Sequence, residues 1–313
     1  MKIKDLRDFI DRECRIDVAI IVNVTEGKSS KGSKYLSLTL QDSTGTVEAK
    51  KWEVSSSDES ILALKKVVRV EGYPLIYNGS QLQFKITDVE PAMSYNEEEL
   101  ILKSPVDRKV LIERFMGYVE GIEDEEIKTI VSEIVLNKYD KLLLHPAAKT
   151  NHHEYAGGLL HHEVSMLALA EQIANLYPSI NKDLLYGGII LHDLGKIIEL
   201  SGPIAPEYTL KGKLLGHISI IQTDIIEAAK KHGIDGEVVT LLQHMVLSHH
   251  GKLEYGSPVL PLLLEAEVMY QIDNMDSKIV MINKALKDVE VGGTSARIMG
   301  LDARSFYKHG KSK

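Results

Sequence analysis

The spacing of apolar residues changes once along this chain, and this change constrains the fold more than any other feature. As far as Val89, apolar and polar residues alternate as in half-buried β-strands. From Val106 onward, apolar residues recur at i, i+3 and i+4, the spacing of amphipathic helices. A chain of 313 residues is long enough for two cores. We therefore expect an all-β domain over residues 1–90, a linker over 91–105 and an all-α domain over 106–292.

The all-β part contains five expected strands, separated by turns rich in glycine, serine and asparagine, with one short helix over residues 55–66. The strands are expected at residues 16–24, 35–41, 46–52, 67–77 and 81–89. Five strands with a helix between the third and the fourth is the order of an OB-fold barrel. The stretch LQDSTGTVEAKKW also resembles the second hairpin of nucleic-acid-binding OB domains.

The all-α part contains seven expected helices, mostly bounded by glycine or proline. They are expected at residues 106–118, 124–137, 158–176, 182–194, 213–231, 236–248 and 260–286. The tail over residues 293–313 carries five basic residues and one acidic residue, so it is expected to be a flexible basic arm.

Charge and cysteine content exclude several classes of protein. The net charge of −8 argues against a domain that grips duplex DNA by bulk electrostatics. Because Cys14 is the only cysteine, internal disulfides and cysteine-based metal clusters are excluded. We find no signal peptide and no apolar stretch that could span a bilayer, so we expect a cytoplasmic protein that does not act at membranes. The oligomeric state stays open.

Eleven of the twelve histidines lie between His145 and His250, which is the strongest chemical signal in the sequence. Several of them, together with Asp193 and Asp273, lie on or beside apolar helix faces. A buried imidazole or carboxylate is costly unless it is paired or bound to a metal. A single histidine of this kind is more often an ordinary hydrogen-bonded residue. A set this large favours a metal site, and histidine suits transition metals better than magnesium.

The series His…His-Asp…His…His-His…Asp resembles the HD-domain metallo-phosphohydrolase superfamily in its two-metal version. The segments GGLLHHEVSM, ILHDLGK, LSHHGKLEYG and IDNMDSK, behind an OB domain, resemble the YhaM-type 3′-5′ exoribonuclease family over essentially the whole chain. This resemblance implies two divalent ions, manganese being expected and iron or cobalt being alternatives. The implied ligands are His162, His192, Asp193 and Asp273 for one ion, and His217, His249 and His250 for the other, with Asp193 bridging.

Some assignments remain open at this stage. His161 stands where an acidic residue is expected, so either His161 or His162 could be the ligand, and the inward helical stripe favours His162. Asp276 is an alternative to Asp273. Lys196 is either a solvated lysine or a catalytic cation that stabilises the phosphate in the transition state, beside the catalytic Asp193.

The OB domain offers aromatic and basic residues for contacts with single-stranded nucleic acid. The candidates are Lys34, Tyr35, Lys50 and Trp52, with His152 and His153 before the first ligand helix. We therefore expect a metal-dependent 3′-5′ exoribonuclease that hydrolyses single-stranded RNA to nucleoside monophosphates, with single-stranded DNA as a second candidate substrate. The alternatives are an HD hydrolase of small nucleotides and a binding module with a degenerate HD site.

Overall fold

The computed structural model describes residues 1–313 except 31, 78–80, 103, 149–153, 288 and 312–313, and it contains two compact units. The first unit is Met1–Lys103 and the second is Ser104–Lys313. Among the described residues, no helix is long and apolar enough to cross a bilayer.

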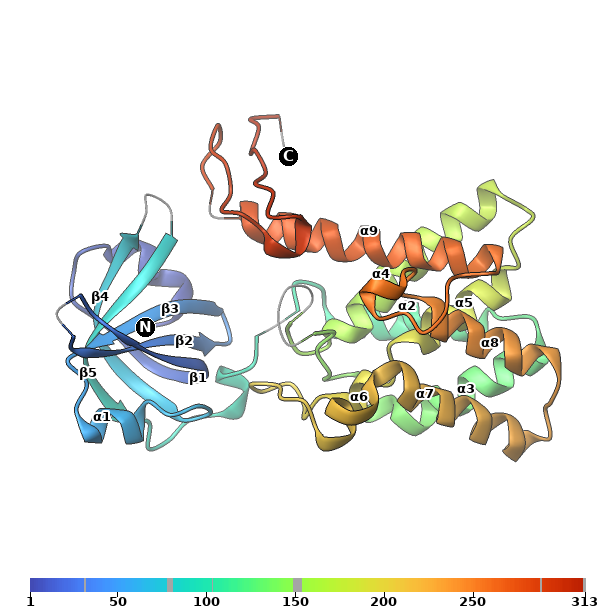
Figure 1. Ribbon diagram of the computed structural model, residues 1–313, viewed down its shortest axis with the longest axis horizontal. Coiled ribbons are helices and arrows are strands. Elements are labelled where there is room, and N and C mark those ends of the chain that lie inside the picture. The colour runs from blue at the N-terminus through green and yellow to red at the C-terminus, as the bar shows by residue number, and fades with distance from the viewer. Residues whose placement is uncertain (31, 78–80, 103, 149–153, 288, 312–313) are drawn as a thin grey trace. The chain divides into compact units, whose positions relative to one another are not determined.

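The first unit is a closed five-stranded barrel, shown in blue to teal in Figure 1. Its strands are β1 (Cys14–Lys28), β2 (Lys34–Asp42), β3 (Gly45–Trp52), β4 (Val67–Tyr77) and β5 (Gln81–Pro91). They are ordered β1-β2-β3-β5-β4, and the parallel β3–β5 pairing closes the barrel. Every second side chain along a strand points into the barrel, where Leu38, Leu40 and Phe84 are fully buried.

Short helical segments complete the barrel. Helix α1 (Ser56–Ile61) begins at a capping box between Ser55 and Asp58 and lies between β3 and β4, as predicted. A 3₁₀ turn, η1 (Ile3–Phe9), precedes β1, and another, η2 (Glu97–Glu99), follows β5. The barrel and its strand order confirm the OB-fold prediction.

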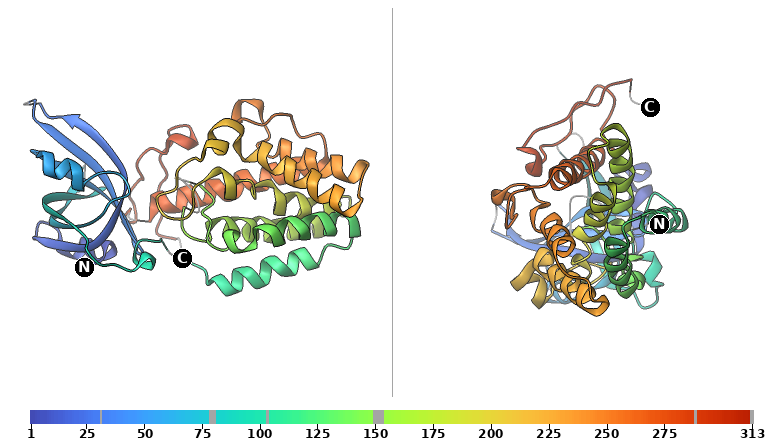
Figure 2. Two further views of the ribbon diagram at one scale, coloured as in Figure 1. Left: turned by 90° about the horizontal axis from the view of Figure 1, so that it is seen from below. Right: turned by 90° about the vertical axis from the view of Figure 1, so that its right-hand side faces the viewer.

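The second unit is a helical bundle (Figures 1 and 2). Its helices are α2 (Arg108–Glu120), α3 (Glu125–Leu142), α4 (Gly158–Leu176), α5 (Lys182–His192), α6 (Lys196–Glu199), α7 (Leu210–His232), α8 (Glu237–Ser248) and α9 (Leu264–Leu286). Two 3₁₀ turns, η3 (Leu253–Tyr255) and η4 (Met299–Leu301), follow α8 and α9. Helix α5 is buried on every side from Leu184 onward, so it forms the centre of the bundle. The all-α prediction for this part is confirmed.

Two local features differ from the sequence expectation. Helix α6 was not predicted, because four residues are too few to show a helical period. Helix α5 was expected to reach Leu194 but ends at His192, which leaves Asp193 as its C-cap.

The C-terminal tail has a folded path in its described part. Isolated bridges pair Thr294 with Tyr307 and Ile298 with Arg304, and Leu301 between them is buried. The basic composition suggested a flexible arm, but these backbone pairs and one apolar anchor turn the segment back on itself. The predicted boundaries at residues 90, 105 and 292 remain predictions.

Candidate metal centre

The candidate ligands come from five helices that meet around the C-terminal end of α5. His162 lies in the first turns of α4, His192 and Asp193 end α5, and His217 lies within α7. His249 and His250 follow α8, and Asp273 lies in α9. The structure therefore brings together seven residues that are separated by up to 111 positions in sequence.

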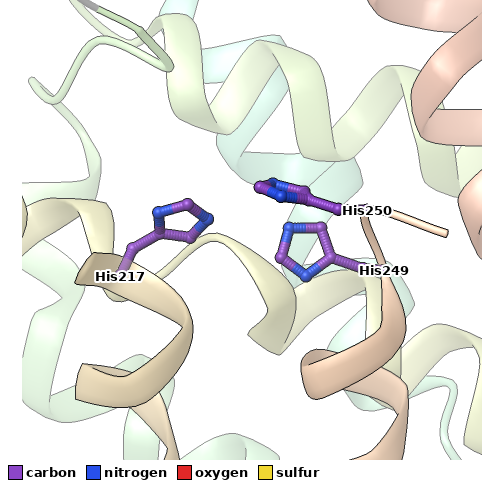
Figure 3. A group of neighbouring side chains, drawn as sticks. All are labelled: His217, His249 and His250. Carbon is purple, nitrogen blue, oxygen red and sulfur yellow. The ribbon is translucent and has the colours of Figure 1, made fainter. Parts of the chain in front are cut away.

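These side chains form two groups with the spacing of metal ligands. One group is His162, His192 and Asp193, and the other is His217, His249 and His250. Within each group, one ligand atom from each residue lies within 4.8 Å of the others. Figure 3 shows the three rings of the second group turned toward one another. The ring centroids of His192 and His249 lie 5.0 Å apart, so the two groups are adjacent.

Asp193 lies between the two groups, and its two carboxylate oxygens face different groups. Oδ2 is 3.4 Å from Nε2 of His192 and 3.9 Å from Nε2 of His162. Oδ1 is 3.4 Å from Nε2 of His217 and 3.9 Å from Nε2 of His249. Ending α5 at His192 places this carboxylate in the space between the groups rather than along the helix surface.

All five histidines of these groups have an acceptor at Nδ1. Carbonyl oxygens accept from three of them, at 2.6, 2.7 and 3.0 Å for His192, His249 and His250. Carboxylates accept from the other two, which are His162 and His217. Because carbonyl and carboxylate oxygens only accept, each Nδ1 carries a proton, and in a neutral ring Nε2 then presents a lone pair. This is the tautomer that binds a metal through Nε2.

Burial and charge hold these groups in the states that a cation requires. Burial lowers the pKa of His192 and His249, so both rings are neutral at pH 7. Burial raises the pKa of the Asp193 carboxyl, but Lys196 and the surrounding histidines outweigh it and hold that pKa well below its usual range. Asp193 is therefore an ionised carboxylate in a buried site.

The unpaired atoms test whether a metal fits this arrangement. Among the described residues, Nε2 of His192, Nε2 of His217 and Oδ1 of Asp193 are buried and have no hydrogen-bond partner. A native protein rarely leaves such atoms unsatisfied unless an ion or a water binds them. All three are metal-ligand atoms of the two groups, so the donor set fits divalent cations with a preference for nitrogen ligands.

The structure separates the two pairs of alternatives that the sequence left open. Asp273 Oδ1 lies 3.3 Å from Nε2 of His162, on the metal side of the ring, whereas Asp276 Oδ2 accepts from Nδ1 at 2.7 Å. Burial lowers the pKa of His162, but hydrogen bonds to Asp273 and Asp276 raise it to about 10, so this ring binds a cation only by releasing its Nε2 proton. His161 turns elsewhere, since its Nδ1 lies 2.6 Å from the hydroxyl of Tyr155. His162 and Asp273 therefore have the positions of ligands.

Lys196 and Glu163 are two further ionisable residues that determine the net charge around Asp193. The Lys196 ammonium lies 2.5 Å from Asp193 Oδ2 and is mostly buried, so it is not a solvated lysine. Burial lowers the pKa of Lys196, but Asp193 outweighs this and raises it, so the lysine is charged. Glu163 is fully buried, and this burial raises its pKa well above the usual value. Burial therefore favours the neutral form of this carboxyl.

Two glycines make the close approach of α6 and α7 possible. A Cβ on Gly195 would lie 2.2 Å from the carbonyl oxygen of His217, so only glycine lets the chain after Asp193 pass this close to His217. Gly216 breaks α7 with φ 71° and ψ 157°, and this break directs His217 at Asp193.

Three of the predicted nucleic-acid contacts in the barrel lie together, and with Tyr77 they form an aromatic cluster. The members of this cluster are Tyr35, Lys50, Trp52 and Tyr77. The rings of Tyr35 and Trp52 lie 4.7 Å apart. The Lys50 ammonium lies 5.2, 5.7 and 5.9 Å from the ring centroids of Tyr35, Trp52 and Tyr77. Trp52 and Tyr77 are exposed, so a flat ligand can reach them.

Other predicted contacts are not in this cluster. Lys34 pairs with Glu26 at 3.0 Å and Glu59 at 2.6 Å, so its charge is already compensated. His152 and His153 lie outside the described residues.

Sequence reasoning missed Glu199, which accepts hydrogen bonds from His217. The only available signal was an acidic residue three positions after Lys196 in HDLGKIIE.

A cavity of about 250 Å³ lies between α3 and α7, lined by charged residues such as Glu133 and Lys231, and none of the candidate ligands lines it.

Comparisons with known proteins match both units. The family model described as HD domain matches residues 159–278, which include every candidate ligand, and the OB-fold nucleic acid binding domain matches residues 18–92. A third model, of a proposed helicase, matches residues 96–179.

Solved structures resemble the barrel only distantly. The second OB-fold domain of replication protein A from Methanococcus maripaludis is 19% identical, covering 31% of this chain and 97% of that chain, with a TM-score of 0.25. PriB from Ralstonia solanacearum is 17% identical, covering 25% and 95%, with a TM-score of 0.22. These scores are too low to support an inference about function.

A curated relative matches almost the whole chain. The 3′-5′ exoribonuclease YhaM of Geobacillus sp. (strain WCH70) is 46% identical over 299 residues, which is 94% of this chain and 92% of the relative. An OB-fold barrel, an HD domain that holds all the candidate ligands, and this identity over nearly the full length together show that the chain belongs to the YhaM 3′-5′ exoribonuclease family.

Proposed function

We propose that this protein is a metal-dependent 3′-5′ exoribonuclease that removes nucleoside monophosphates from single-stranded RNA with two divalent cations. The observation that carries the proposal is the carboxylate of Asp193, whose two oxygens face two separate groups of histidine Nε2 atoms. A carboxylate of this kind can bridge two cations at the separation of about 3.5–4 Å found in two-metal hydrolases. The polarity and the substrate rest on the name of the curated relative.

The proposed ligand sets follow this geometry. One cation would be held by His162, His192, Asp193 and Asp273, and the other by His217, His249, His250 and Asp193. When bound, the two cations would supply Lewis acidity to the phosphate and lower the pKa of a bound water. Five of the seven ligands are imidazoles, which favours transition metals over magnesium. Manganese is the expected metal, with iron and cobalt as alternatives.

The residues of the chain have separate tasks in this reaction. Asp193 keeps the two sites at a fixed separation. Lys196 is a cation beside Asp193 Oδ2 that can donate to a phosphate oxygen as negative charge develops on it. Burial of Glu163 favours its neutral form, which would limit the negative charge near an anionic substrate.

The barrel is proposed to hold the RNA strand. Stacking on exposed aromatic rings beside a lysine retains single strands without reading their sequence, as the cluster around Lys50 allows. Such binding does not require a 2′-hydroxyl, so single-stranded DNA is a second proposed substrate. That the enzyme works in the cytoplasm also remains a prediction.

The test uses pure full-length protein with a 5′-labelled 20-nucleotide RNA and manganese. We expect a ladder of products that shortens from the 3′ end, with monophosphates released. DNA of the same sequence and a cyclic nucleotide are the comparison substrates. Hydrolysis of the cyclic nucleotide with intact RNA would overturn the proposal in favour of a small-nucleotide hydrolase. RNA binding without hydrolysis, with manganese present, would favour a degenerate site.

A further inference from the structure

The histidines of the two ligand groups differ in what holds their Nδ1 atoms. Three are held by backbone carbonyls of their own helix end or the loop that follows it. Two are held by carboxylates from other elements, and there is one of these in each group. Asp276 of α9 holds His162 of the first group, and Glu199 of α6 holds His217 of the second.

Glu199 makes two contacts with His217 through one oxygen. Its Oε1 accepts from the backbone N–H at 3.0 Å and lies 3.1 Å from Nδ1 of the ring. Glu199 is buried, and the same oxygen accepts from both N–H groups. A single carboxyl oxygen thus fixes both the main chain and the ring of this ligand.

The break at Gly216 explains why the backbone contact is needed. A φ of 71° with a ψ of 157° is essentially restricted to glycine, and it interrupts the helical hydrogen bonds of α7. The helix starts again at His217, and the first N–H groups of a helical segment have no partner within that segment. Glu199 supplies that acceptor, so the restarted helix and the ligand ring are oriented together.

We infer that Glu199 is the positioning residue of the three-histidine site. It controls metal binding at that site and does not affect metal binding by the group of His162, His192 and Asp193. This inference rests on the proposed function, since it assumes two cations. A carboxylate behind a ligand histidine fixes the tautomer and raises the basicity of Nε2, and its loss typically weakens metal binding roughly 10–100-fold. Asp276 has the corresponding relation to His162, so each carboxylate should govern one ion.

The experiment measures manganese bound per chain after dialysis at a series of manganese concentrations. In Glu199→Gln, we expect one ion to bind roughly 10–100-fold more weakly and the other to be unchanged. Asp276→Asn should show the same pattern. Glu227→Gln, the same change at an exposed position on α7, should bind as the wild type does. Glu199→Asp, which keeps the charge but shortens the side chain, is a second variant that should also weaken one ion.

Double variants identify which ion is affected. At a manganese concentration where Glu199→Gln retains one ion, adding His250→Ala should cost no further metal, whereas adding His192→Ala should remove the remaining ion. Circular dichroism and the thermal midpoint of the metal-free proteins check folding. A purely structural role would lower the midpoint and leave the manganese affinities unchanged.

The outcomes separate this inference from the proposed function. If the wild type binds two ions and Glu199→Gln binds both within threefold of wild-type affinity, the inference is wrong while the two-metal proposal stands. Equal weakening of both ions would also overturn it. If the wild type binds fewer than two manganese ions, both the inference and the two-metal proposal are wrong.

Discussion

The aromatic cluster of the barrel and the histidine centre of the helical unit differ in how far their side chains are exposed to solvent. The barrel presents Trp52 and Tyr77 to solvent, with Lys50 near both rings. The helical unit hides His162, His192 and Asp193 almost completely. Exposed groups cost little to maintain and can adapt to many ligands, whereas buried polar groups must each be satisfied. Burial therefore makes the ligand arrangement rigid, whereas the exposed rings of the barrel remain accessible to ligands of different shape.

This difference leads to a graded expectation for substitutions. Each change in the buried centre removes a group whose neighbours have no alternative partner, so effects there should be large and specific. Changes in the exposed cluster remove one of several similar contacts, so effects there should be smaller and confined to binding. The predictions below follow this order.

The largest effect is expected for Asp193→Ala. Loss of the carboxylate leaves two groups of imidazoles with no shared anion between them, so at least one metal and nearly all turnover should be lost. We expect turnover to fall at least about 1000-fold. Metal content per chain and hydrolysis of labelled RNA are the measurements. Asp235→Ala, an exposed aspartate, is the control, and full metal occupancy with normal turnover in Asp193→Ala would refute the bridging role.

A smaller loss is expected for Lys196→Ala. Every ligand stays in place and one buried cation is removed, so turnover should fall roughly 100–1000-fold while both metals stay bound. The pair of measurements is the same, with exposed Lys230→Ala as the control. Metal loss in Lys196→Ala would mean that this lysine holds Asp193 for the metals rather than contacting the phosphate.

Trp52→Ala tests the barrel side of the comparison. One stacked base is worth about 1–3 kcal/mol, so binding of a 20-nucleotide RNA should weaken roughly 5–150-fold. Hydrolysis of a small phosphodiester should not change, because that substrate needs only the metal centre. Fluorescence anisotropy gives the affinity, and Tyr95→Ala, another exposed aromatic of the same unit, is the control. Wild-type affinity in Trp52→Ala would remove this ring from the binding surface.

The smallest effect is expected for Glu133→Gln, in an exposed ion-pair network of the helical unit. Hydrogen bonds from Lys231, Asn137 and His232 lower the pKa of Glu133 to about 2. A carboxyl whose pKa falls on folding stabilises the protein above its ordinary value near 4.5, and this stabilisation is lost as the pH falls toward 2. The variant should therefore have a slightly lower thermal midpoint at pH 7, and the difference from wild type should shrink below pH 4.5. A difference that grows with acid would contradict the assignment.

Most of the fold was predictable because its signal is local. Strand and helix periods depend on neighbouring residues, so both units and most element ranges follow from the sequence. The failures occurred where the local signal is weak. Helix α6 is too short to show a period, and the end of α5 at His192 lies inside a continuous apolar run.

The ligand types were also readable in the sequence, since clustered histidines and HD segments are visible without coordinates. The sequence alone determined the two fold classes, the family resemblance and the identities of the residues that could bind metal. Only the tertiary structure decided which atoms face one another: the two oxygens of Asp193 toward different groups, Asp276 behind His162, and Glu199 behind His217. These contacts depend on how closely separate helices pack, as at Gly195 against His217, and no local periodicity encodes that distance.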